Sequence, residues 1–470
     1  MAPARWGSRV GFLLATVGAA VGLGNIWRFS AVVGQNGGGA YLVPYLIAAV
    51  VCAIPLLVLE LSIGRRLRTD VVSAFRAVDP AYTGVGWVVT GGVFLILSYY
   101  LVLTGWVFGF LVSWLLGSPV TFASFTDSWL PIVYFAVATA ATGTIVAAGV
   151  RGGIERMATL VMPTVFVLLL ALAGYAVTLP GWGAGTRFLF TPRFGVLADV
   201  GLWSVAVGQV FFSLSVGQGI MLTYGSYVDD DTDLVESAVL ITVADVGAAV
   251  LAGLVIFPVV FSFGLEPTLC TELAFTTLPA AFTAMAYGRV IAVAFFGLLC
   301  LAALSSAVAL LEVGVAAAVT TTTLSRNAAS AVLTGGIFLA GLPSALSYSP
   351  LELAVAGRPV LDLVDESVGT FALPVSALAI VTVFVWAVDP EPVRVDLGPA
   401  YGVVRYLIPV VLVGVTVARA IGVAVPAWRL LLDYAPGLGL GPLLAVGVFA
   451  ILATVGWLVR SRGRPPDSPG

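Results

Sequence analysis

The chain has 470 residues, of which 60% are hydrophobic and only 10% are charged, whereas a soluble protein of this length carries about 25% charged residues. It contains no histidine, which excludes Ser-His and Cys-His catalysis, HExxH zinc chemistry and haem ligation by histidine. The formal net charge of −3 gives no reason to expect a nucleic-acid partner.

Long apolar blocks run through the whole sequence, and many reach the roughly 20 residues that a helix needs to cross a bilayer. The blocks are continuous rather than alternating, so we expect an all-α polytopic membrane protein with about twelve transmembrane helices. In chain order, the expected spans cover residues 9–33, 40–63, 83–115, 128–149, 155–179, 199–226, 233–264, 275–318, 327–344, 362–388, 401–421 and 437–459. Several are longer than a straight crossing requires, which predicts tilted or kinked helices.

Arginine placement predicts the orientation of these spans. Most arginines, including Arg5, Arg65, Arg66, Arg151 and Arg326, fall on one side of the predicted bundle, together with both termini. Because basic residues accumulate on the cytoplasmic side, we expect a plasma-membrane protein with both termini in the cytoplasm.

The cysteines give no sign of a metal or redox site. Cys52, Cys270 and Cys300 are far apart and form no CxxC pair, so we interpret them as small apolar residues. No nucleophile constellation is evident either, and we therefore expect no enzymatic activity.

Two glycine motifs interrupt predicted spans one and six near their middles. The motifs are Val21-Gly-Leu-Gly24 and Val216-Gly-Gln-Gly219. Glycine weakens a helix, and backbone groups freed at membrane depth are tolerated only around a cavity or ligand, so the pair indicates a transporter binding site. Close helix packing through small residues is an alternative explanation. Polar Asn25 and charged Arg28 in the same apolar run favour a polar interior.

The sequence closely resembles the neurotransmitter:sodium symporter family, which has the LeuT fold. The resemblance rests on WGSRVGF at residues 6–12, GLGNIWRF at 22–29, NGGG at 36–39, GQVFFSLS at 208–215 and LSS at 304–306, and it extends over about residues 5–390. It implies a prokaryotic-type, sodium-coupled symporter that imports a small amino acid-like substrate by alternating access. It also implies two inverted five-helix repeats at 1–180 and 181–390, with helices 1 and 6 broken, followed by spans eleven and twelve and a tail at 391–470.

The resemblance implies two sodium sites built from oxygen ligands, which suit a hard cation. The first is expected to comprise Ala20, Asn25, Ser213 and Asp245, completed by the substrate carboxylate. A one-residue slip in span seven would put Ala244 in place of Asp245. The second is expected to comprise Gly18, Val21, Ala302, Ser305 and Ser306. Hydrogen bonding of the two serines to their own helix is the alternative for that pair.

The resemblance also implies a substrate pocket between the broken helices and spans three and eight. Its expected lining residues are Ala19, Leu23, Gly24, Ile96, Tyr100, Phe212, Ser215, Gln218 and Leu310. Amides at the helix breaks and the Tyr100 hydroxyl are expected to face a substrate carboxylate. The apolar wall favours an uncharged side chain, and Gln218 adds a polar spot.

Chloride-dependent relatives hold the anion with a tyrosine, a glutamine and two hydroxyl residues. Tyr45, Gln209 and Ser213 match this set, but the fourth position is Ala249, which has no hydroxyl. Asp245 would place a negative charge beside the anion, which is strongly disfavoured at low dielectric. We therefore expect transport without chloride.

The gates are expected to differ at the two ends of the pathway. Arg28 is expected to pair with Asp365 as the outer gate, and Trp6 to plug the inner side. The inner salt bridge of relatives falls on Pro3 and Thr320 here, so both of its partners are missing. Glu60 is interpreted as a structural carboxylate near the break in span six. Gly153 and Pro163 have the spacing at which span five unwinds in relatives, with a simple proline kink as the alternative.

Two other functions are compatible with the same fold. The protein would be a sensor if it bound sodium and ligand without transporting them, and it would carry a different small solute if the substrate were not an amino acid. In each case the expected partners are a small molecule and the lipid bilayer.

Overall fold

A computed structural model describes residues 4–192, 194–265, 273–387 and 391–417. Within these ranges eight helices are long and apolar enough to cross a membrane: Gly39–Leu67, Pro80–Leu115, Leu130–Ala147, Val150–Ala176, Leu234–Ser262, Gly288–Thr321, Arg326–Leu346 and Val360–Trp386. Two bent pairs pass the same test together, namely Arg9–Ala20 with Gly24–Gln35 and Val393–Ala400 with Val403–Val417. The predicted helical polytopic fold is therefore confirmed over the described residues. Predicted span 437–459, Cys270 and Pro3 lie outside them.

The helices in the first half of the chain are α1 (Arg9–Ala20), α2 (Phe29–Gln35), α3 (Gly39–Ala48), α4 (Ile54–Leu67), α5 (Val71–Val78), α6 (Thr83–Leu115), α7 (Phe122–Thr126), α8 (Leu130–Ala147), α9 (Arg156–Ala176) and α10 (Trp182–Phe190). Those in the second half are α11 (Val200–Ser213), α12 (Ile220–Gly225), α13 (Leu234–Ser262), α14 (Leu278–Ala284), α15 (Gly288–Thr321), α16 (Arg326–Leu346), α17 (Val360–Val364), α18 (Thr370–Val381) and α19 (Glu391–Leu397). A two-residue hairpin, β1 (Ala354–Val355) with β2 (Arg358–Pro359), precedes α17.

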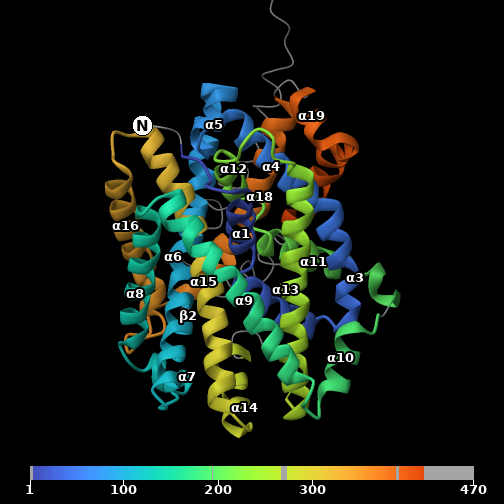
Figure 1. Ribbon diagram of the computed structural model, residues 1–470, viewed down its shortest axis with the longest axis vertical. Helices are drawn as coiled ribbons and strands as arrows, with labels where there is room; N and C mark the ends of the chain where they lie inside the picture. The colour runs from blue at the N-terminus through green and yellow to red at the C-terminus, as the bar shows by residue number, and fades with distance from the viewer. Residues whose placement is uncertain (1–3, 193, 266–272, 388–390, 418–470) are drawn as a thin grey trace, which may run out of the picture. The chain divides into compact units, whose positions relative to one another are not determined.

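Helix α1 lies in the middle of the bundle and packs against α9, α13 and α15 (Figure 1). Helices α6, α8, α15 and α16 pack together on one side of it, and α12 packs against α4. The short helices α5 and α19 lie at one end of the bundle, whereas α7 and α14 lie at the other (Figure 1).

The first broken helix has a defined start and a defined interruption. Ser8 caps α1 by accepting a hydrogen bond from the Gly11 backbone amide at 2.9 Å. The helix ends at Ala20, and Val21 has an extended conformation with φ −75° and ψ 99°. The chain resumes as a π-helical turn at Gly24–Arg28 and continues into α2, bent by 52° from α1.

The second break separates α11 from α12. Gly217 and Gly219 have positive φ angles of 81° and 72°, a conformation that only glycine adopts at little cost. The Gly217 amide, released from the helix, donates to the Glu60 carboxylate of α4 at 2.6 Å. Glu60, the predicted structural carboxylate, is buried and lies at the second break.

The prediction of one span over residues 275–318 is wrong. Helix α14 ends at Ala284, and α15 begins at Gly288 after a turn in which Tyr287 has a left-handed φ of 61°. Gly288 and Arg289 follow the turn directly, and this glycine and charge could have indicated the break, but the prediction joined the apolar residues on both sides of them.

Candidate functional site

The two helix breaks are held against each other by side chains. The Ser215 hydroxyl donates to the Ala19 carbonyl at 3.0 Å, and the Gln209 amide donates to the Gly24 carbonyl at 2.9 Å. Ser215 has a left-handed φ of 54°, which costs a non-glycine residue about 1–2 kcal/mol. Backbone held in such a conformation by its surroundings is concentrated at binding sites.

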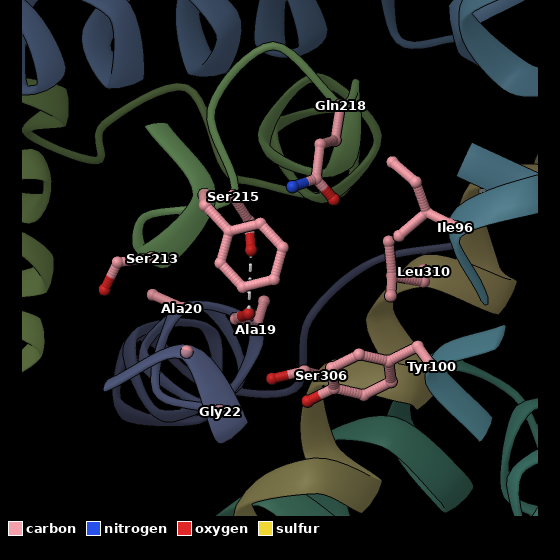
Figure 2. Close-up of a pocket in the computed structure, with 12 residues that line it drawn as sticks. Ala19, Ala20, Gly22, Ile96, Tyr100, Ser213, Ser215, Gln218, Ser306 and Leu310 are labelled. Atoms are coloured by element: carbon pink, nitrogen blue, oxygen red, sulfur yellow. Dashed lines mark hydrogen bonds between the residues drawn. The ribbon is translucent and has the colours of Figure 1, made fainter. Parts of the chain in front are cut away.

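The central pocket lies between these breaks and helices α6 and α15 (Figure 2). It is lined by Ala19, Ala20, Gly22, Gly24, Ile96, Tyr100, Phe212, Ser213, Ser215, Gln218, Ser306 and Leu310. Every predicted substrate residue except Leu23 lines it. Leu23 lines the neighbouring Arg28 cavity described below. Gly22 was missed, although it belongs to the first glycine motif.

Polar groups occupy opposite walls of the central pocket. On one wall the Tyr100 hydroxyl accepts a hydrogen bond from the Leu23 amide at 3.4 Å, and Ser306 lies beside it (Figure 2). On the opposite wall the Gln218 side-chain amide points into the space (Figure 2). Ile96 and Leu310 provide apolar surface between them. This arrangement suits a small molecule with a polar group at each end.

The first oxygen cluster, defined by Asn25, Ser213 and Asp245, is buried beside the pocket. The Asn25 amide nitrogen lies 2.8 Å from the Ser213 hydroxyl and 2.6 Å from an Asp245 carboxylate oxygen. The Ser213 hydroxyl is 2.9 Å from both Asp245 oxygens. The structure thus brings Asp245, the preferred alternative to Ala244, into contact with two other predicted sodium ligands. Ala20 lines the adjoining pocket.

The second oxygen cluster, defined by Gly18, Ala302, Ser305 and Ser306, joins α1 to α15. The Ser305 hydroxyl lies 2.8 Å from the Gly18 carbonyl and 2.9 Å from the Ala302 carbonyl. The Ser306 hydroxyl lies 3.4 Å from each of the same carbonyls. Val21 follows the end of α1 directly. The serines therefore hydrogen-bond to their own helix, as the alternative interpretation expects, and also to the Gly18 carbonyl of α1.

The described residues contain no group of three or more His, Cys, Asp or Glu side chains placed to hold a metal ion. The two clusters consist of hydroxyl, amide, carboxylate and carbonyl oxygens. Such ligands suit a hard cation and not a transition metal.

The residues that match a chloride site surround the first oxygen cluster. Tyr45 faces Asp245 and Ser213. Gln209 uses its amide nitrogen on Gly24, and its buried side-chain oxygen has no hydrogen-bond partner among the described residues. Ala249 is fully buried and brings no hydroxyl. Asp245 contributes a carboxyl group to this set, in contact with Ser213.

The Arg28 cavity, about 320 Å³, adjoins the central pocket. Its lining includes Leu23, Arg28, Tyr100, Phe212 and Asp365. Arg28 and Asp365, the two residues predicted to pair as an outer gate, both line this cavity but form no ion pair within the described ranges. The guanidinium of Arg28 instead lies 4.2 Å from the centre of the Phe212 ring.

Tyr348 marks the far wall of this cavity. Its hydroxyl donates to the Asp362 carboxylate, 3.2 Å from each oxygen. Burial, reinforced by the Asp362 charge, raises the pKa of Tyr348 to about 12. The hydroxyl therefore stays protonated and remains a donor at physiological pH.

At the opposite end of α1, Trp6 is packed among aromatic rings. Its indole nitrogen donates to the Tyr224 carbonyl at 3.0 Å, and its ring contacts Phe12, Tyr224 and Tyr227. Only 5% of Trp6 is exposed. Aromatic side chains therefore fill the space around Trp6 at this end of α1.

Two charged residues in the turn before α9 form what we call the N-terminal clamp, defined by Arg151 and Glu155. Arg151 donates to the carbonyls of Arg5 and Trp6 at 3.0 and 3.1 Å. The Glu155 carboxylate accepts from the Gly7 amide at 2.6 Å and from the Ser8 hydroxyl at 3.0 Å. Sequence reasoning missed this clamp. The turn is a π-helical segment at Val150–Glu155, and α9 stays helical through Pro163.

A buried ion pair lies close to the same end. Glu312 of α15 is fully buried, and its carboxylate accepts from Arg326 at 3.1 and 2.5 Å and from the Tyr227 hydroxyl at 2.7 Å. Thr320, by contrast, is exposed and bonds to its own helix. A carboxylate inside an apolar run was the signal that could have identified Glu312.

Comparison with known proteins gives a consistent picture. Residues 4–131 and 129–403 match the profile of the Sodium:neurotransmitter symporter family. The chain is 36% identical over 391 residues to the uncharacterized sodium-dependent transporter YhdH of Bacillus subtilis, covering 80% of this chain and 86% of that relative. It is 32% identical over 447 residues to an uncharacterized sodium-dependent transporter of Haemophilus influenzae, covering 88% and 97%. The crystal structure of MhsT in complex with L-phenylalanine is similar, with a TM-score of 0.82, 38% identity and coverage of 88% of this chain and 99% of that one.

Proposed function

Because this chain belongs to the sodium:neurotransmitter symporter family, we propose that it imports a neutral amino acid together with two sodium ions by alternating access. Membership makes the chain a multi-pass, sodium-dependent transporter and not an enzyme. Beyond family membership, we propose the substrate class, the number of ions and the transport cycle.

The observation that carries the proposal is that the central pocket shares residues with both oxygen clusters. Ser213 lines the pocket and belongs to the first cluster, whereas Ser306 lines it and belongs to the second. An ion in either cluster would therefore border the substrate. A substrate carboxylate would complete the first site next to Asn25 and Ala20. The amino acid bound in the similar MhsT structure supports this substrate class.

The two ends of the pathway support an alternating cycle. The Arg28 cavity leads to the central pocket, while the Trp6 end is filled with aromatic side chains. We take the Trp6 end, with Arg5, Arg65 and Arg151, as cytoplasmic, so this conformation faces outward. Pairing of Arg28 with Asp365 would then close the outer side, and release of the N-terminal clamp would open the inner side. The proposed division into repeats at 1–180 and 181–390 puts one break in each repeat.

Transport is proposed to be independent of chloride. The buried carboxylate of Asp245 lies against Ser213 and faces Tyr45, where an anion would otherwise be held. Two negative charges about 4 Å apart repel by about 4 kcal/mol at an effective dielectric constant of 20. The carboxylate would thus replace the anion.

Binding of radiolabelled amino acids to the purified protein tests the proposal. We expect saturable binding of at least one neutral amino acid in sodium chloride and in sodium gluconate, and loss of that binding when potassium replaces sodium. Equal binding in potassium would refute sodium coupling. Failure of every amino acid to bind would instead favour another small solute as substrate.

A further inference from the structure

Gln218 presents a side-chain amide to the central pocket from the second helix break. Only 4% of the residue is exposed. Figure 2 shows the amide nitrogen and oxygen pointing into the space between Ser215 and Ile96. No protein group in the described ranges forms a hydrogen bond with this amide. It is a buried polar group without a protein partner, in a wall of the proposed binding site.

Such a group needs a hydrogen-bonding ligand. A primary amide offers two donors and one acceptor oxygen, and buried polar groups are almost always satisfied. The central pocket leaves about 30 Å³ for the centres of water molecules, enough for about two waters. A ligand that displaces these waters without replacing their hydrogen bonds leaves the amide unsatisfied and loses affinity.

The other walls of the central pocket limit the charge and the length of the substrate side chain that would reach Gln218. The wall opposite Gln218 holds the Tyr100 hydroxyl, which accepts from the Leu23 amide, and the adjacent Gly22 amide donates to Asn25 of the first oxygen cluster. The carboxylate is therefore placed near this turn, and the side chain extends toward Gln218. Ile96, Phe212 and Leu310 are apolar. None of the described residues that line the pocket is charged, so a charged side chain would find no counter-ion. The small free volume favours a short side chain.

We propose that Gln218 determines specificity and that the substrate is a neutral amino acid whose short side chain carries a hydroxyl or an amide. The inference rests on the proposed function and narrows it. It separates this chain from the similar protein MhsT, whose structure holds phenylalanine, an amino acid whose side chain offers no conventional donor or acceptor to an amide.

Competition between side chains of equal shape tests the inference. Proteoliposomes with an inward sodium gradient take up a labelled amino acid from a panel of twenty, and unlabelled threonine, valine, asparagine and leucine compete with it. Threonine and valine are nearly isosteric, as are asparagine and leucine. We expect the polar member of at least one pair to compete about 10- to 100-fold more strongly, because the apolar member leaves the buried amide unsatisfied.

Substitution of Gln218 tests whether this residue causes the preference for the polar amino acid. In Gln218→Met, which keeps the side-chain length, the preference is expected to fall to near unity. The matched change Gln35→Met, in the Arg28 cavity, is expected to leave the ratio as in the wild type. Equal or stronger competition by both apolar members would overturn the inference, and so would a ratio that persists in Gln218→Met. The competition ratios measured on the wild-type protein test the inference even if that variant does not fold. Absence of sodium-driven uptake of every amino acid would instead reject the proposed function itself.

Discussion

Asp245 is the single residue whose charge has the widest consequences. It is fully buried, contacts Asn25 and Ser213, and faces the tyrosine that would otherwise help to hold an anion. The same carboxylate can therefore serve the proposed first sodium ion and exclude chloride.

Replacement of this charge is expected to change the ion requirement. Wild-type uptake should be equal in sodium chloride and sodium gluconate. The double variant Asp245→Asn with Ala249→Ser removes the carboxylate and adds the missing hydroxyl, so its uptake should require chloride. Uptake by each protein in the two salts is the measurement. A wild-type protein that loses transport in gluconate would contradict the role given to Asp245.

Two buried serines allow the second oxygen cluster to be tested with an internal control. Ser305 donates to the Gly18 carbonyl at 2.8 Å, and Ser330 makes a bond of the same length to the Gly143 carbonyl, between α16 and α8. We expect Ser305→Ala to raise the sodium concentration for half-maximal binding about tenfold, whereas Ser330→Ala leaves it unchanged. A similar shift in both variants would show a general packing effect and no ion site.

At the scale of elements, the N-terminal clamp would close the inner side in the proposed cycle, in place of the salt bridge that the family resemblance implies. Pro3 and Thr320 supply no such pair. Arg151 and Glu155 instead form hydrogen bonds with backbone groups of residues 5–7 and with the Ser8 hydroxyl. The clamp ties the start of α1 to the start of α9, the helix that contains Pro163.

Loss of the clamp is expected to loosen the segment before α1. Glu155 is buried, whereas Glu236 pairs with Arg9 at 2.5 Å with about half of both side chains exposed. Because exposed ion pairs contribute little and buried hydrogen-bonded charges contribute more, Glu155→Gln should speed amide exchange at residues 5–11 by about 10-fold or more. Glu236→Gln should change it little. Hydrogen–deuterium exchange checks both. Equal amide exchange in Glu155→Gln and the wild type would show that the clamp does not hold the segment before α1.

The elements also show where sequence reasoning succeeds and where it stops. The breaks between α1 and α2 and between α11 and α12 were predictable, because each glycine motif interrupts an apolar run and polar Asn25 and Arg28 beside the first motif favoured a binding site over close helix packing. The turn at Tyr287 is followed by Gly288 and Arg289, so the sequence offered a signal there that the prediction of one long span did not use. The clamp was not predictable, since its partners are mainly backbone groups, which have no signature in the sequence.

For the whole molecule, the sequence predicted which residues gather but not the conformation in which they are found. Asn25, Ser213 and Asp245 meet as expected from three distant segments. Arg28 and Asp365 reach the same cavity but do not pair there; in the proposed cycle they would pair in a different state. Glu312 and Arg326 were missed because each was read within its own span, although the fold brings them together.

The coupling follows from this arrangement. In the proposed cycle, sodium ions bound beside the substrate would be driven inward by the membrane potential, because each positive charge that crosses gains about 2.3 kcal/mol per 100 mV. Two ions moving with one substrate would supply about twice that amount. A sensor with the same sites would bind sodium and ligand without transporting either across the membrane.

The most direct test is accumulation of a labelled neutral amino acid in proteoliposomes with an imposed inward sodium gradient. We predict that the internal concentration rises above the external one and that it collapses to equality when sodium is equal on both sides. Saturable, sodium-dependent binding without accumulation would contradict transport and leave a sensor.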